Sequence, residues 1–133
     1  MANQIAVGID ISKKTMDVAI GHEQSTAIFS NDGAGHQALI EVLKSHQVSL
    51  IVMDATGQYQ LAFACALQAA GFAVVVINPR QALDFAKAMG RLVKTDSVDA
   101  RMLAELAQVL NQRPDRDRFI KPMPDQAQQH LHA

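Results

Sequence analysis

The chain has 133 residues, of which 49% are hydrophobic and 19% charged, so it can bury one domain core and is not wholly disordered. Its formal net charge of −1 excludes a general positive field, so any nucleic-acid binding has to come from local patches. The single cysteine excludes an internal disulfide, and no apolar run approaches the ~20 residues of a membrane span. The N-terminus lacks the features of a signal peptide. We therefore expect a cytoplasmic protein that has no membrane partner.

Three short strands are predicted first, and helices then alternate with strands. Apolar and β-branched runs, separated by polar or glycine-containing turns, favour strands at residues 5–9, 15–20 and 25–30. Hydrophobic periodicity and turn residues then predict helix 35–46, strand 50–53, helix 61–70, strand 72–77, helix 80–89 and a last helix that Thr95 caps. The late strands lack polar alternation, which is typical of parallel strands covered on both faces.

This order predicts an α/β domain with a mixed five-stranded sheet flanked by helices. The first three strands form an antiparallel meander, and right-handed crossovers place strand 50–53 parallel to strand 5–9. The composition changes after Asn111, where charged residues and prolines replace the apolar pattern. We therefore expect a domain over residues 1–111, and a linker or disordered tail over 112–133.

Four aspartates occupy matching places in these elements. Asp10 ends the first strand and Asp54 the fourth, so both are expected at the carboxyl edge of the sheet, where open α/β sheets bind ligands. Asp96 and Asp99 open the last helix, and the helical period places Asp99 within its apolar stripe. Because clustered carboxylates repel one another unless cations are bound, and oxygen ligands suit Mg²⁺ or Mn²⁺, the pattern predicts a divalent-metal site for phosphoryl transfer.

The same segments resemble a known family. VGIDISK at 7–13, VMDATG at 52–57, INPRQA at 77–82 and KTDSVDAR at 94–101 are similar to the N-terminal domain of the DEDD-type insertion-sequence transposases. The resemblance spans roughly residues 5 to 111. It implies an RNase H-like (RuvC-like) fold and a metal-dependent domain that cleaves and exchanges DNA strands.

The resemblance also implies which residues act and what the protein binds. Asp10, Asp96 and Asp99 match the family's metal-binding and catalytic aspartates, while Asp54 stands where the family usually has glutamate and is one methylene shorter. Members continue into a C-terminal domain with a nucleophilic serine, so this chain alone is not expected to complete recombination. DNA, a structured guide RNA and a homo-oligomer of the full-length protein are the implied partners.

Basic residues near these segments are candidates for contacts with nucleic-acid phosphates. They are Lys13, Lys14, Arg80, Arg91, Lys94 and Arg101.

Two other functions stay open. An actin-like or sugar-kinase-like ATP-binding domain shares the strand order but needs a second, glycine-rich phosphate loop, and no such run follows Gly57. The other alternative is a module that binds nucleic acid without cutting it.

Overall fold

The computed structural model describes residues 5–21, 26–54, 60–90 and 99–120. Five strands form one sheet in the order β3-β2-β1-β4-β5. Strands β1 and β2 and strands β2 and β3 pair antiparallel, whereas β4 lies parallel to both β1 and β5. This confirms the predicted mixed sheet and the position of the fourth strand beside the first. The strands are β1 (Ile5–Ile11), β2 (Thr15–Ile20), β3 (Ala27–Ser30), β4 (Val48–Asp54) and β5 (Val74–Ile77).

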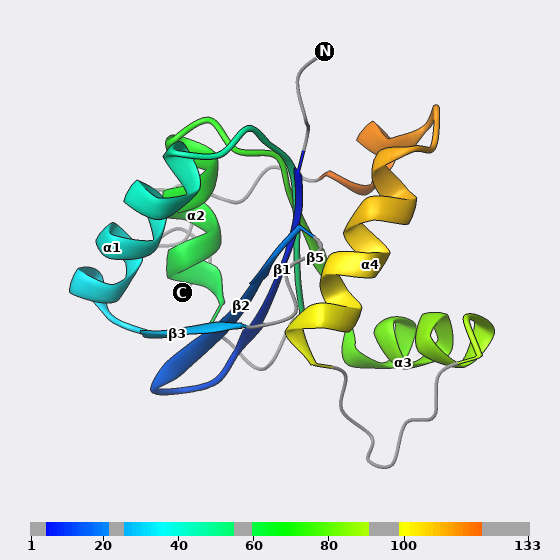
Figure 1. Cartoon of the computed structure of the whole chain (residues 1–133), viewed down its shortest axis with the longest axis horizontal. Helices are drawn as coiled ribbons and strands as arrows, with labels where there is room; N and C mark the ends of the chain where they lie inside the picture. Colours follow the sequence, from blue (N-terminus) through cyan, green and yellow to red (C-terminus); the bar gives the residue numbers. More distant parts are fainter. Residues whose placement is uncertain (1–4, 22–25, 55–59, 91–98, 121–133) are drawn as a thin grey trace, which may run out of the picture.

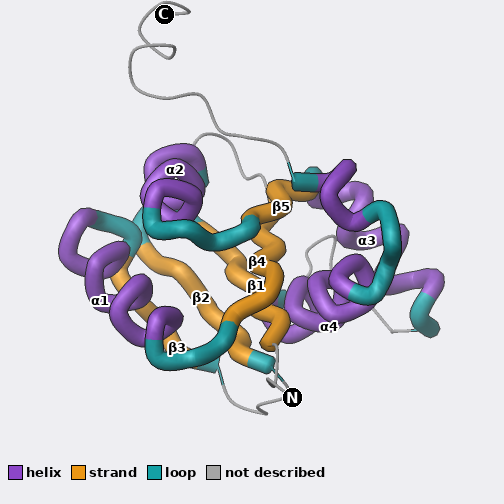
Figure 2. The backbone as a smooth tube through the Cα atoms, turned by 90° about the horizontal axis from the view of Figure 1, so that it is seen from above, coloured by secondary structure: helices purple, strands orange, loops and turns teal. Residues whose placement is uncertain are grey.

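Helices cover both faces of the sheet (Figures 1 and 2). The helices are α1 (Gly33–Lys44), α2 (Leu61–Ala69), α3 (Pro79–Ala88) and α4 (Ala100–Asn111). Alternate residues of each strand point to opposite faces, so the sheet divides the core in two. Val7 and Ile9 of β1 pack in the cluster with α1 and α2. Ala6 of β1 belongs to the cluster with α3 and α4.

Glycine at position 8 allows α4 to lie directly on β1. A β-carbon at Gly8 would stand 2.2 Å from both the carbonyl oxygen of Ala100 and the backbone nitrogen of Ala104. Ala19 of β2 packs against the same two alanines. Small residues on both elements therefore bring the backbone of α4 close to the middle of the sheet, and the first turn of the helix lies over Gly8 of β1.

The start of α4 differs from the prediction. The helix begins at Ala100, and Asp99 has extended backbone angles and accepts a hydrogen bond from the Met102 N–H. Asp99 is therefore the N-cap and not a member of the helical stripe, so that expectation was wrong. The physical reason is that the aspartate side chain accepts a hydrogen bond from a free N–H of the first turn. The spacing of apolar residues contains no information about such a cap. Thr95 and Asp96 lie outside the described residues.

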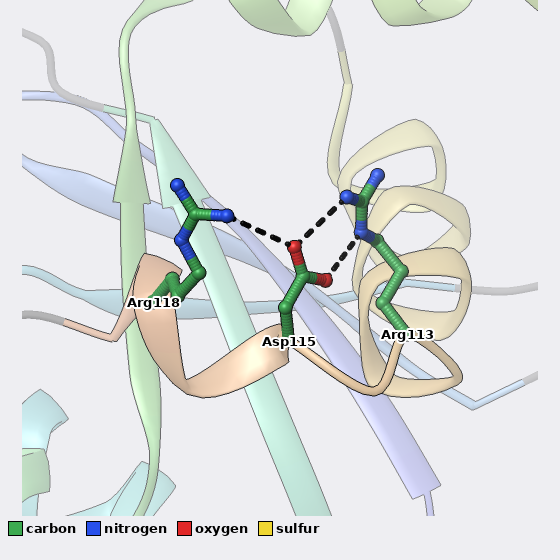
Figure 3. Close-up of polar contacts among 3 residues, drawn as sticks. All are labelled: Arg113, Asp115 and Arg118. Atoms are coloured by element: carbon green, nitrogen blue, oxygen red, sulfur yellow. Dashed lines mark hydrogen bonds and ion pairs between the residues drawn. The ribbon is translucent and has the colours of Figure 1, made fainter.

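The structure describes nine residues beyond α4, from Gln112 to Ile120. Asp115 accepts hydrogen bonds from Nε and Nη2 of Arg113, at 2.8 and 3.1 Å, and also faces Arg118 (Figure 3). The Arg113 guanidinium lies over the ring of Phe119, in the short 3-10 helix Arg116–Phe119. Ile120 packs against the α3–α4 side of the core. The domain boundary at residue 111 stays a prediction.

Candidate functional site

Two aspartates lie side by side where β1 and β4 reach the carboxyl edge of the sheet. The parallel register pairs Ile9 with Met53, so the next residues along the two strands are Asp10 and Asp54. Since Ile9 and Met53 pack on the α1–α2 side, both aspartates belong to the face that α4 covers. Asp54 is buried, with only 9% of its surface exposed, and Asp10 is half-buried.

A third aspartate continues this row on the other side of β1. In the antiparallel register Asp17 of β2 lies directly opposite Asp10. It is on the α4 side too, because Ala19, two residues further, packs against α4. No sequence motif indicates a role for Asp17. The register of the short hairpin, with Ile11 opposite Met16, makes Asp10 and Asp17 partners.

Asp99 approaches the row from above. The contact of α4 with Gly8 sets the start of the helix over β1, two residues before Asp10 along the strand. One carboxylate oxygen of Asp99, Oδ1, accepts the Met102 N–H at 3.0 Å, and the residue is exposed. The cap therefore fixes the position of the Asp99 side chain while leaving it accessible to solvent and ligands.

The neighbouring aspartates affect the pKa of Asp10. The pKa of Asp10 is raised from 3.8 to about 6, first by burial and then by the negative charges of Asp54, Asp17 and Asp99. Burial disfavours an ionised carboxyl, and like charges nearby disfavour it further. A cation bound among these side chains would relieve both effects, so the site is built to gain from a positive charge.

The donors suit a hard divalent cation in kind, but the described residues do not form a closed ligand cage. Carboxylate oxygens are the ligands that Mg²⁺ and Mn²⁺ prefer. Within residues 5–21, 26–54, 60–90 and 99–120, no three His, Cys, Asp or Glu side chains are grouped closely enough to hold a metal ion. Asp96, the fourth predicted ligand, lies outside these ranges. Metal ligation by these aspartates therefore stays a prediction.

Four of the six predicted basic residues can be placed. Lys13 and Lys14 are exposed in the turn that follows β1, and Arg101 is exposed in the first turn of α4. Arg80 is exposed at the start of α3, directly after β5, where Asn78 and Gln81 form a capping box. All four lie near the carboxyl edge of the parallel strands. Arg91 and Lys94 fall outside the described residues.

Helix α3 also borders an open hollow of about 400 Å³. Its described lining residues come from one side of the helix and include two cations and one acid: Pro79, Arg80, Leu83, Asp84 and Lys87.

No helix in the described part of the chain is long and apolar enough to cross a membrane.

The fold is similar to that of RuvC. A structure of RuvC from Thermus thermophilus aligns with a TM-score of 0.50 at 15% identity, covering 94% of this chain and 85% of that one. A second structure, of T. thermophilus RuvC in complex with a Holliday junction substrate, gives a TM-score of 0.49 at 14% identity, over 77% of this chain and 87% of that one. The first match shows the fold, which is RNase H-like of the RuvC type and agrees with the prediction.

Sequence comparison identifies the family. The pilin gene-inverting protein of Moraxella bovis is 30% identical over 124 residues, an alignment that covers 86% of this chain and 38% of that protein. This chain thus spans well under half the length of its curated relative. The family model for DEDD transposases of the IS110 type, described as "Transposase", matches residues 7–131. The chain therefore belongs to the DEDD family of transposases.

Proposed function

We propose that this chain is the metal-dependent DNA-cleavage and strand-transfer domain of a transposase or site-specific recombinase. One observation carries the proposal: at the carboxyl edge of the sheet, burial and then the negative charges of Asp54, Asp17 and Asp99 raise the pKa of Asp10. Perturbed carboxyls gathered at the carboxyl edge of a sheet are typical of catalytic sites. Family membership and the nuclease fold support DNA as the substrate.

The proposed ligands are Asp10, Asp54, Asp96 and Asp99, with Mg²⁺ or Mn²⁺ as the metal. When bound, two such ions would activate the attacking oxygen and stabilise the leaving oxygen of a DNA phosphodiester. Paired β-strands hold Asp10 and Asp54, so their carboxylates need little reordering to bind. Asp99 is held by its cap to Met102. The half-buried Asp10 must release its proton before it can bind a cation.

The other predicted partners concern full-length family members, and this chain matches only 38% of the length of one such relative. We propose that self-association and a structured guide RNA serve the full-length protein, on the strength of the family resemblance. The ATP-binding alternative is not proposed, because the chain belongs to a transposase family. A module that binds DNA without cutting it remains the second candidate, favoured by the shorter side chain of Asp54.

A cleavage assay separates these two functions. Labelled branched DNA is incubated with the chain and Mn²⁺, beside Asp10→Asn and, as a matched control at an exposed acid on α3, Asp84→Asn. The cleavage domain predicts nicking that needs Mn²⁺, is lost in Asp10→Asn and survives in Asp84→Asn. Tight binding of the same DNA without any nicking would refute cleavage by this chain and favour the binding module.

A further inference from the structure

The turn between β1 and β2 presents two adjacent lysines, three and four residues beyond Asp10. It is closed by its own hydrogen bonds: the Ser12 N–H donates to the Thr15 carbonyl at 2.9 Å, and the Thr15 N–H donates to the Ser12 hydroxyl at 3.2 Å. Lys13 and Lys14, at the tip, are exposed. Neither lysine has an ion pair within the described part of the chain.

A residue from outside the hairpin holds this turn at two points. Asn31, which lies between β3 and α1, donates its side-chain Nδ2–H to the Ser12 carbonyl at 2.8 Å. Its backbone N–H donates to the Lys14 carbonyl, also at 2.8 Å. The backbone on either side of Lys13 is therefore fixed to a second segment of the fold.

Asn31 is in turn anchored to the core. Its Oδ1 lies 2.7 Å from Nε2 of His36, and because the amide oxygen only accepts, Nε2 of the histidine donates. The half-buried His36 ring stacks on Phe63, with ring centroids 4.7 Å apart, and Phe63 is fully buried. A continuous path of contacts thus runs from the core through His36 and Asn31 to the lysine turn.

A short turn that closes on itself does not need these outside bonds in order to form. Their effect is to fix the position of the two lysines. Asp10 lies in the same hairpin, where the β1–β2 register sets its place, so the lysines are fixed relative to Asp10. A cationic surface held in place before binding loses less conformational entropy when a ligand arrives. Lysines at such a place suit the phosphates of a nucleic-acid backbone, which are contacted for positioning and not for sequence.

We propose that the Ser12–Thr15 turn is a preset contact for DNA phosphates beside the scissile one, and that Asn31 and His36 are positioning residues that hold it. The inference rests on the proposed function and specifies how the DNA strand is aligned over the acids. It adds two residues, Asn31 and His36, that carry no net charge in this network and that a search for basic residues would not select.

Binding of a labelled DNA duplex, followed by fluorescence anisotropy over a series of KCl concentrations, tests the turn. Lys13→Ala/Lys14→Ala should weaken binding roughly fivefold. It should also reduce the slope of log K against log salt by about 2, since two phosphate contacts are lost. Lys44→Ala, at the far end of α1, is the matched control and should change neither quantity. An unchanged slope in the double lysine variant would overturn the proposal.

A double-mutant cycle tests the positioning role of Asn31. Asn31→Ala should lower affinity and slope in the unaltered chain but change neither when both lysines are already alanine, because it acts through them. An equal loss in both backgrounds would show an effect that does not pass through the turn and would contradict this part. His36→Gln, which can still donate to Asn31, should retain more of the affinity than His36→Ala. Failure of the unaltered chain to bind DNA at all would instead refute the proposed function together with this inference.

Discussion

Replacing Asp10 by asparagine should stabilise the protein at neutral pH when no metal is present. The folded-state pKa of Asp10 is about 6, against 3.8 for an ordinary aspartate, a difference of about 2 units. Each unit corresponds to about 1.4 kcal/mol, which gives an upper limit near 3 kcal/mol for the cost of ionising Asp10 in the folded state. Because solvent screens a half-exposed group, about 1.5 kcal/mol is the reasonable expectation.

The dependence on pH has a definite sign. The folded state holds the Asp10 proton between pH 3.8 and about 6 while the unfolded state has released it, so stability falls as pH rises through this window. The cost is fully present above pH 6 and vanishes below pH 3.8. Asp10→Asn should therefore gain most at neutral pH and progressively less as the pH falls towards 4.

Urea unfolding in EDTA measures this gain directly. The unaltered chain, Asp10→Asn and the control Asp84→Asn are compared at neutral pH and near pH 4. Asp84 is exposed on α3, so its substitution should stay within about 0.5 kcal/mol of the unaltered chain. If Asp10→Asn is no more stable than the unaltered chain at neutral pH, the proposed cost of ionising Asp10, through its burial and its repulsion by Asp54, Asp17 and Asp99, is refuted.

Three further substitutions test the packing and hydrogen bonds around the site. Gly8→Ala should lower the free energy of unfolding by ~3 kcal/mol, because the added methyl meets the α4 backbone at 2.2 Å. The control Gly33→Ala adds a methyl that meets no other atom and should be tolerated. Urea unfolding of both variants checks this. Asp99→Ala should cost ~1 kcal/mol by removing the α4 cap, while Asp99→Asn keeps a capping oxygen and should cost much less; equal losses would contradict the capping role. Burial lowers the pKa of His36 below 6.5, so the folded state resists its protonation and this residue's contribution to stability is lost as pH falls below 6.5. Comparing the pH dependence of unfolding with that of His36→Gln isolates the effect, and identical profiles would refute it.

Much of the fold was predictable from local pattern, because continuous apolar runs and turn residues marked the strands and the right-handed crossover rule ordered them. Strand β2 has the predicted bounds, and β4 lies beside β1 as expected. The start of α4 was not predictable in this way. Apolar periodicity continues on both sides of Asp99, and only the hydrogen bond from Met102 shows that the helix begins after it.

The site was only partly predictable, because its members depend on register and on contacts between distant segments. Asp10 and Asp54 follow from the rule that parallel strands share a carboxyl edge. Asp17 requires the pairing of β1 with β2, which no motif contains. Asn31 donates a hydrogen bond to Ser12, 19 residues away, and His36 reaches the lysine turn only through Asn31, so no local pattern indicates either residue.

The central claim is that the aspartates at this edge of the sheet bind a divalent metal. Calorimetric titration of Mn²⁺ into the 133-residue chain at neutral pH, beside Asp10→Asn and Asp84→Asn, tests it most directly. The account predicts saturable binding to the unaltered chain and to Asp84→Asn, and its loss in Asp10→Asn. Equal Mn²⁺ binding by Asp10→Asn and the unaltered chain would contradict the assignment of the site.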